Sequence, residues 1–283
     1  MTTFMGLNDF IYTLPNCDKS ESEDLHCFLV SGKLAGLDGL VKRAELHGFY
    51  SCYVEDNFSM CRQWFYLASR LREECCKFSN GWSMEFPDPL IFALLSDCAP
   101  LIGRYGNLST IAKPHLELPS FNEAALRPSR HDFRYMVHYL QALIRRDWTC
   151  AGNIEICVRR SFKKMSAVDL EWFSVGAALR DSNKDEIIEL IYKLLKPGVH
   201  KARNKERFRE LSGQVWSHHP VMFTKLAWMH GLEIEIDSPL VPMALMPIRP
   251  LEHYDDVYDF LKPGYVPVVE KPKKSFLDRV FRR

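Results

Sequence analysis

Residues 165–260 constrain the fold most, because amphipathic helical patterns follow one another there with short, well-marked stops. In the clearest of these patterns, Ser182 or Asn183 provides an N-cap, and Glu186 stands where a capping box places an acidic residue. Pro197, followed by a glycine, predicts the end of that helix. Its apolar stripe consists of Ile187, Ile188, Ile191, Leu194 and Leu195. Only a short turn separates this helix from the one predicted over 167–180, so the two helices form a tight hairpin.

Similar patterns predict helices in most of the remaining chain. The predicted ranges are 32–48, 57–78, 88–103, 131–148, 150–165, 167–180, 203–219 and 221–230. Near the N-terminus, segments 7–14 and 25–32 fit either short strands or helix fragments, and the acidic stretch 19–25 fits a loop or a helix start. No repeating consensus links the helices.

The C-terminal part of the pattern is less regular. Residues 232–237 alternate apolar and acidic side chains, which predicts one short strand. The prolines that follow forbid long regular elements. Residues 253–261 predict a last short helix, with Tyr254 and Tyr258 one turn apart.

Together these patterns predict a mainly α fold, an irregular stack of antiparallel helical hairpins with at most a few short strands. Segment 103–130 is rich in Gly, Pro, Asn and Ser, which predicts a long loop at a subdomain junction. We therefore divide the chain into an N-terminal helical or irregular subdomain (1–125), a C-terminal helical domain (126–265) and a basic tail (266–283), whose end we expect to be mobile.

Composition narrows the class of protein. With 47% apolar and 26% charged residues, the chain has the make-up of an ordinary globular protein. Lys and Arg (37) balance Asp and Glu (36), which argues against a nucleic-acid partner. The N-terminus carries no secretory signal, and no apolar run approaches the roughly 18 residues that span a membrane. We therefore expect a cytoplasmic protein without a membrane partner.

The nine cysteines are odd in number and include no Cys-x-x-Cys pair. Several occupy apolar positions of helical patterns, so we expect reduced, mostly buried thiols instead of a disulfide framework. Cys75 and Cys76 lie inside a helical pattern and not at a helix N-terminus, where a thiolate is stabilised. We therefore expect them in the core.

Four histidines, His200, His218, His219 and His230, lie within one short stretch and raise the question of a metal site. Zinc sites on helices place ligands one turn apart with an acidic partner, and that spacing is missing. We predict no metal ligand here. His218 and His219 are expected to cap or to face solvent near a helix C-terminus, where a cation is favoured.

Two further clusters have a functional and a structural interpretation. A cluster of basic residues could bind phosphates or an acidic partner. It could also be the solvated side of two helices, and the balanced net charge favours this second interpretation. This basic face contains Arg145, Arg146, Arg159, Arg160, Lys163 and Lys164. The tyrosines and prolines of 239–259 form either a recognition edge or a cover over the helix ends.

Three carboxylates lie close together near the C-terminus, and we expect them to be solvated. They are Asp255, Asp256 and Asp259.

The sequence contains no Walker A loop, no dinucleotide-binding glycine motif and no nucleophile elbow. We therefore predict no catalytic, cofactor-binding or metal-binding residue and no enzymatic activity.

Residues 165–261, about a third of the chain, contain a set of characteristic short stretches: DLEW (169–172), KPGVH (196–200), LAWMHGLEIEID (226–237), DSPLVP (237–242), PL (250–251), DFL (259–261), Tyr254 and Tyr258. In these stretches the chain resembles the immunity protein 49 family of bacterial polymorphic toxin systems. The resemblance implies a helical cytoplasmic protein that binds a cognate toxin domain and blocks it. The matched positions are turns, stops and core aromatics, so the toxin-binding residues are unknown.

We therefore expect an immunity protein that neutralises a cognate polymorphic toxin in the producing bacterium by occlusion. Two other classes stay open. One is a helical-repeat-like adaptor in a larger assembly, and the other is a cryptic hydrolase that uses the cysteine and histidine content.

Overall fold

A computed structural model describes residues 5–78, 88–107, 134–161, 167–203 and 215–265. These residues form a mainly helical structure, which confirms the predicted fold class. The α-helices are α1 (Met5–Leu29), α2 (Leu34–Tyr53), α3 (Phe58–Phe78), α4 (Asp88–Leu95), α5 (Ala99–Tyr105), α7 (Arg134–Arg145), α8 (Trp148–Ser161), α9 (Ala167–Arg180), α10 (Lys184–Leu195), α11 (Pro197–Arg203) and α13 (His218–Met229). Two 3-10 helices follow, η3 (Met243–Leu245) and η4 (Asp259–Leu261).

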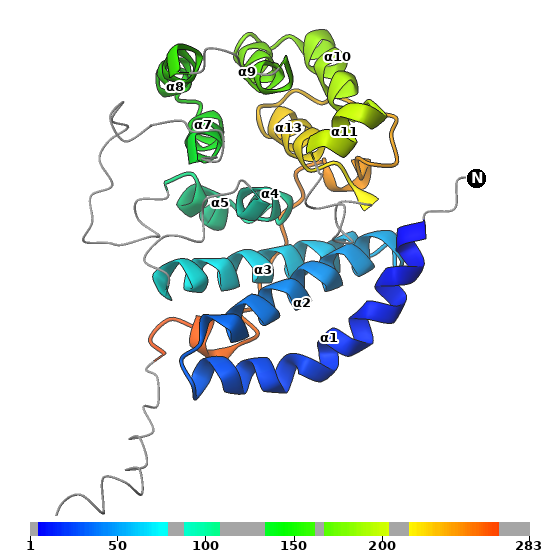
Figure 1. Ribbon diagram of the computed structural model, residues 1–283, viewed down its shortest axis with the longest axis vertical. Coiled ribbons are helices and arrows are strands. Elements are labelled where there is room, and N and C mark those ends of the chain that lie inside the picture. Colours follow the sequence, from blue (N-terminus) through cyan, green and yellow to red (C-terminus); the bar gives the residue numbers. More distant parts are fainter. Residues whose placement is uncertain (1–4, 79–87, 108–133, 162–166, 204–214, 266–283) are drawn as a thin grey trace, which may run out of the picture.

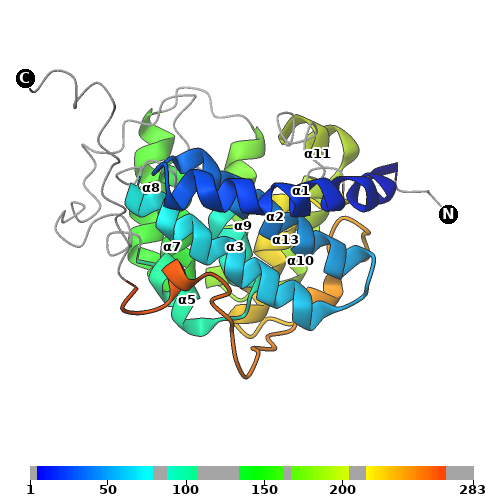
Figure 2. The same ribbon diagram turned by 90° about the horizontal axis from the view of Figure 1, so that it is seen from below.

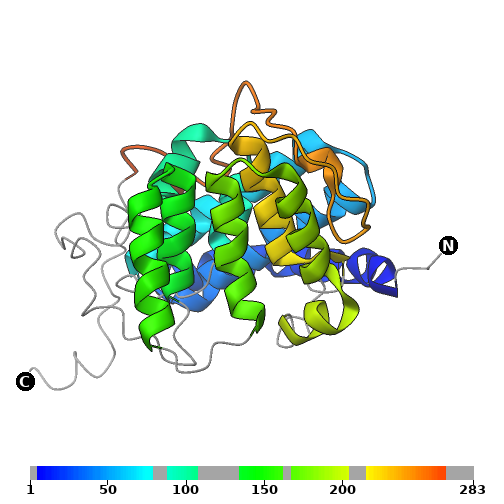
Figure 3. The same cartoon turned by 90° about the horizontal axis from the view of Figure 1, so that it is seen from above.

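The helices form two layers that cross each other. Helices α1, α2 and α3 are neighbours along their lengths and make the first layer (Figure 1). Helices α7, α8 and α9 run across this layer, which Figure 2 shows from below and Figure 3 from above. Between them, α4 packs on α3 and on α13, so this short helix connects the two layers.

The ambiguous N-terminal segments 7–14, 19–25 and 25–32 belong to helix, because α1 runs through nearly all of them. The next two helices match their predictions closely. Asn57 begins α3 by accepting a hydrogen bond from the Met60 backbone N–H through Oδ1 at 3.0 Å.

Helix stops in the second half also follow the sequence. The Asn183 side chain accepts from the Glu186 backbone N–H at 3.2 Å and donates to its carboxylate at 2.9 Å. The capping prediction is therefore confirmed with Asn183 as the cap. Helix α10 ends at Leu195, and Pro197 opens α11. Gly231 has φ +80° after α13, as a C-terminal glycine stop requires. Residues 204–214 of the predicted helix 203–219 lie outside the described residues.

The core is centred on four aromatic rings from distant parts of the chain. Phe49 of α2 packs edge-on against Trp216, with ring centroids 4.5 Å apart. Phe65 of α3 and Phe92 of α4 complete the group, and their ring centroids lie 5.1 Å apart. All four side chains are at most 4% exposed. This cluster takes residues from both sides of the predicted boundary at residue 125.

The C-terminal segment is extended where the sequence predicts a strand and a helix. Residues 232–237 alternate buried and exposed side chains as expected, but no strand pairs with them among the described residues, so the strand prediction is wrong. The helix predicted for 253–261 is also wrong, because only η4 is helical there. Gln63 explains this: its amide donates to the Asp255 carbonyl at 2.9 Å and accepts from the Asp255 N–H at 3.0 Å. These two hydrogen bonds from and to the Gln63 side chain take the place of the backbone hydrogen bonds that a helix would give Asp255.

The end of this segment returns to the first layer. Tyr258 and Leu261 join a second apolar cluster with residues of α1, α2 and α3, including Phe28 and Leu71. The division of the chain into subdomains stays a prediction. No helix among the described residues is both long and apolar enough to cross a membrane.

Candidate functional site

Three charged side chains meet in the interior where α3, the α4–α5 turn and α13 come together. They are Arg62, Asp97 and Lys225, and each is at most 3% exposed. Arg62 Nε donates to Asp97 Oδ2 at 2.7 Å, and Lys225 Nζ lies 2.6 Å from Asp97 Oδ1. Each carboxylate oxygen therefore faces its own cation. Buried charges are tolerated only when they are paired and hydrogen-bonded in this way.

Asp97 reaches this position because it breaks a helix. The sequence predicts one helix over 88–103, and this prediction is wrong, since α4 ends at Leu95 and α5 begins at Ala99. Ser96 Oγ donates to the Ala93 carbonyl at 2.7 Å and closes α4. Asp97 then adopts φ +60°, a left-handed conformation that Asp tolerates better than most residues. The break directs its carboxylate towards the two cations.

The C-terminal segment supplies the remaining partners of Lys225. Its ammonium donates to the carbonyl oxygens of Leu245 at 2.7 Å, Met246 at 3.2 Å and Pro247 at 3.4 Å. These carbonyls lie in and just after η3, where irregular backbone leaves them without helix partners. Lys225 thus fixes the C-terminal segment to α13.

Arg62 and Asp97 hold the same segment from the other side. Arg62 Nη2 donates to the Pro247 carbonyl at 3.3 Å, and Nη1 donates to the Phe58 carbonyl at 3.2 Å. Asp97 Oδ2 accepts from the Arg249 backbone N–H at 3.1 Å. The backbone at Arg249 is therefore anchored to the buried carboxylate.

The cluster carries one more positive than negative formal charge. Burial lowers the pKa of Lys225 to about 8, and attraction to Asp97 opposes that shift. At neutral pH the ammonium form still prevails, so two cations share one carboxylate.

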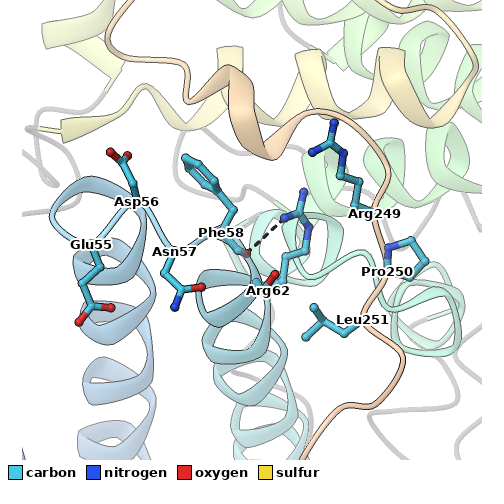
Figure 4. Close-up of a pocket in the computed structure, with 9 residues that line it drawn as sticks. Glu55, Asp56, Asn57, Phe58, Arg62, Arg249, Pro250 and Leu251 are labelled. Carbon is cyan, nitrogen blue, oxygen red and sulfur yellow. Dashed lines mark hydrogen bonds between the residues drawn. The ribbon is translucent and has the colours of Figure 1, made fainter.

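A pocket of about 560 Å³ opens beside Arg62 (Figure 4). The α2–α3 turn, the first turns of α3 and the C-terminal segment form its walls. The lining residues are Glu55, Asp56, Asn57, Phe58, Ser59, Arg62, Arg249, Pro250 and Leu251.

Opposite charges occupy opposite sides of this pocket. Arg62 and Arg249 lie on one side in Figure 4, and Glu55 and Asp56 lie on the other. Arg62 is buried and held by three hydrogen bonds, whereas Arg249 is exposed. The pocket therefore presents one buried guanidinium held by hydrogen bonds and one exposed guanidinium.

The two acids have structural roles of their own. Glu55 accepts from the Ser51 hydroxyl at 3.1 Å. Glu55 and Asp56 come just before Asn57, the residue that caps α3, and carboxylates stabilise a helix N-terminus through its dipole.

The predicted place of two histidines is wrong. His218 and His219 begin α13 instead of ending a helix, and His218 is only 3% exposed. Both accept from indoles: Trp216 Nε1 donates to His218 Nε2 at 3.0 Å, and Trp172 Nε1 donates to His219 Nδ1 at 3.3 Å. Acceptor nitrogens of this kind are unprotonated.

The other two histidines lie in separate polar contacts. His200 Nδ1 is 3.0 Å from the Ser217 hydroxyl, and burial lowers the pKa of His200. His230 Nε2 is 3.1 Å from the Leu143 carbonyl, and burial, with the nearby Arg146, lowers its pKa. No group of three potential metal ligands occurs among the described residues.

Eight cysteines have described side chains, and all are free thiols. Six of them are buried, which confirms the predicted mostly buried thiols. Burial raises the pKa of Cys75 to about 12, so this thiol stays protonated at neutral pH.

The predicted basic face is exposed but makes contacts within the chain. Arg146 Nη2 donates to the Met229 carbonyl at 3.2 Å, and Arg159 forms an ion pair with Glu155 at 2.6 Å. Lys163 and Lys164 lie outside the described residues.

The predicted solvated acids differ from one another. Asp256 is paired with Arg70 at 3.1 Å and accepts from the Tyr66 hydroxyl at 3.0 Å, so the prediction is wrong for this residue. Asp255 and Asp259 are largely exposed, as predicted.

The tyrosines of this segment bind helices of the first half. The Tyr254 hydroxyl donates to the Ser96 carbonyl at 2.7 Å, and the Tyr258 hydroxyl donates to Glu21 at 2.8 Å. The segment therefore covers the helices, one of its two predicted roles.

Asp97 and Lys225 are the main residues that sequence reasoning missed. Each is a single charged residue within an apolar helical run, and such residues are rarely buried unless paired. This signal was available, but it does not identify the partner.

Comparison with known proteins finds no matching family model, no matching curated protein and no matching solved structure.

Proposed function

We propose that the protein is an immunity protein that binds a cognate toxin domain in the cytoplasm of the producing bacterium and neutralises it by occlusion. The pocket beside Arg62 would lie at the centre of the contact surface. The observation that carries this proposal is a charged pocket whose wall is fixed by a buried ion cluster. Preorganised side chains favour binding, because little conformational entropy is lost on association.

The surroundings of the pocket also suit a protein partner. Met60 follows the lining residue Ser59 and is 43% exposed, and Ile248 precedes Arg249 and is 45% exposed. Protein interfaces combine such apolar contacts with polar rims, and arginine is enriched among the residues that dominate their binding energy.

The resemblance of residues 165–261 to the immunity protein 49 family supports the inhibitor class. Inhibition by occlusion requires complementary shape and charge on the two proteins, and a pocket with opposite charges on its two sides provides a specific pattern to complement.

The test is to co-produce the protein with the product of the gene directly upstream of its own, which we expect to encode the toxin. We expect a stable one-to-one complex by light scattering and rescue of growth. Neither complex nor rescue would contradict the proposal.

Matched variants locate the contact surface. Ile248→Glu and Arg249→Glu should weaken the complex and the rescue. Ile156→Glu and Arg180→Glu are the controls, since Ile156 is 47% exposed, the Arg180 side chain is 50% exposed, and neither lines the pocket. A complex insensitive to both Ile248→Glu and Arg249→Glu would place the interface elsewhere.

A further inference from the structure

The donors of Arg62 are not all used. A guanidinium has five N–H groups. Arg62 donates one to Asp97, one to the Phe58 carbonyl and one to the Pro247 carbonyl. Two N–H groups therefore stay without an acceptor among the described residues, although the side chain is only 3% exposed and lines the pocket. Buried donors without a partner are costly, so an acceptor entering the pocket would be favoured.

The charge of the cluster favours the same kind of ligand. Both Asp97 oxygens are engaged, one by Lys225 and the other by Arg62 and the Arg249 N–H. Two buried cations therefore share one carboxylate, and the uncompensated positive charge lies behind the pocket wall.

Arg249 adds a second cation at the surface. Its backbone is fixed by Asp97, but its guanidinium has no ion pair or hydrogen bond within the described part of the chain. It lies on the same side of the pocket as Arg62 (Figure 4). Glu55 and Asp56 lie opposite, beside the start of α3. The free charges on the Arg62 side are thus positive.

We propose that the pocket binds a carboxylate group between Arg62 and Arg249. Resting on the proposed function, that group is an aspartate or glutamate side chain of the partner protein. The two N–H groups left on Arg62 match the two oxygens of a carboxylate, the geometry for which arginine is suited. Phosphate oxygens could accept from the same two N–H groups, but the partner here is a protein, whose anionic side chains are carboxylates.

The test uses the full chain and a small probe, so it does not depend on the toxin. N-acetyl-glutamate amide carries a single side-chain carboxylate, and N-acetyl-glutamine amide is its neutral isostere. Buried, hydrogen-bonded N–H groups exchange slowly, so the Arg62 Nε–H signal should be visible by nitrogen-15 NMR. We expect the glutamate probe to shift the Arg62 signal saturably and the glutamine probe to leave it unchanged.

Substitutions on the two sides of the pocket should have opposite effects on binding of the glutamate probe. Arg249→Ala should weaken binding of the glutamate probe about tenfold, because it removes a charge-assisted hydrogen bond. Asp56→Asn should strengthen it, and Arg180→Ala should not change it. Arg249 is exposed and its side chain has no partner among the described residues, so its loss should not affect folding.

Three results with the glutamate and glutamine probes would overturn the inference. They are no saturable shift, an equal response to the glutamine probe, and an equal response in Arg249→Ala. Tighter binding of inorganic phosphate than of the glutamate probe would also overturn it. If the glutamate probe does not bind, the proposed toxin complex is not contradicted. If the toxin complex does not form, the carboxylate site is not contradicted.

Discussion

The ammonium of Lys225 lies 2.6 Å from the carboxylate of Asp97, and the two side chains are 0% and 1% exposed. This pair joins α13 to the turn between α4 and α5, and Arg62 binds the other oxygen of the same carboxylate. Removing one partner of a buried pair leaves an uncompensated charge, which costs more than the pair itself contributes. Asp97 is therefore the residue on which this junction depends most.

Asp97→Asn should lower the free energy of unfolding by about 3–5 kcal/mol, because two buried cations would then lack a counter-charge. Asparagine also tolerates the left-handed φ of +60°, so backbone strain would not explain the loss. Urea unfolding measures the effect.

Lys225→Met is the comparison for that experiment. It removes one cation but keeps the pair between Arg62 and Asp97, so we expect a smaller loss than for Asp97→Asn. Equal urea midpoints for Asp97→Asn and the unchanged protein would refute the role assigned to the carboxylate.

Lys225 should also give the protein a pH dependence in the alkaline range. Its pKa is about 8 in the folded protein, below the ordinary 10.5. Between these values the unfolded chain binds more protons, so the free energy of unfolding rises with pH. The contribution is fully present above about pH 10.5 and is lost as the pH falls through about 8. From pH 8 to 10, the unchanged protein should therefore gain stability relative to Lys225→Met in urea titrations. A constant difference between the two proteins would contradict the shift.

Local features of the fold could be predicted from the sequence because their causes are local. The cap formed by Asn183 and Glu186 lies within one helical turn, and Gly231 is the residue that a left-handed stop requires. The burial of most described cysteines could be predicted because they occupy apolar positions of helical patterns.

The candidate site could not be predicted, because its geometry depends on contacts between distant segments. In the sequence, Asp97 looks like a polar residue on one continuous helix. Nothing there shows that Lys225 and Arg62 approach it in the fold. The tyrosines at 254 and 258 have helical spacing, but the two hydrogen bonds between Gln63 and the Asp255 backbone keep their segment extended.

Tyr254→Phe should loosen the C-terminal segment beside the pocket. The Tyr254 hydroxyl donates to the Ser96 carbonyl at 2.7 Å and accepts from the Leu251 N–H at 3.1 Å. Its loss should cost about 1–3 kcal/mol and leave both backbone groups without this partner. Hydrogen exchange should then be faster at the Leu251 amide. Tyr265→Phe is the matched control, since its hydroxyl makes no hydrogen bond among the described residues. Unchanged exchange at Leu251 would show that Tyr254 does not hold the segment.

Gly176→Ala should destabilise the second layer, although alanine normally favours a helix. Gly176 lies within α9, and a Cβ there would overlap the Tyr139 hydroxyl of α7. Tyr139 is 2% exposed and its ring packs edge-on against Phe173 at 4.8 Å, so it has little room to move. Overpacking of this kind costs about 1–3 kcal/mol.

Gly152→Ala in α8 is the matched control for that substitution. A Cβ at this position would meet no atom within 4 Å, so the substitution should stabilise the protein by about 0.5–1 kcal/mol through helix propensity alone. Thermal or urea unfolding of the two variants should therefore shift in opposite directions. A stabilising effect of Gly176→Ala would mean that α7 and α9 do not approach as closely at Tyr139 as described.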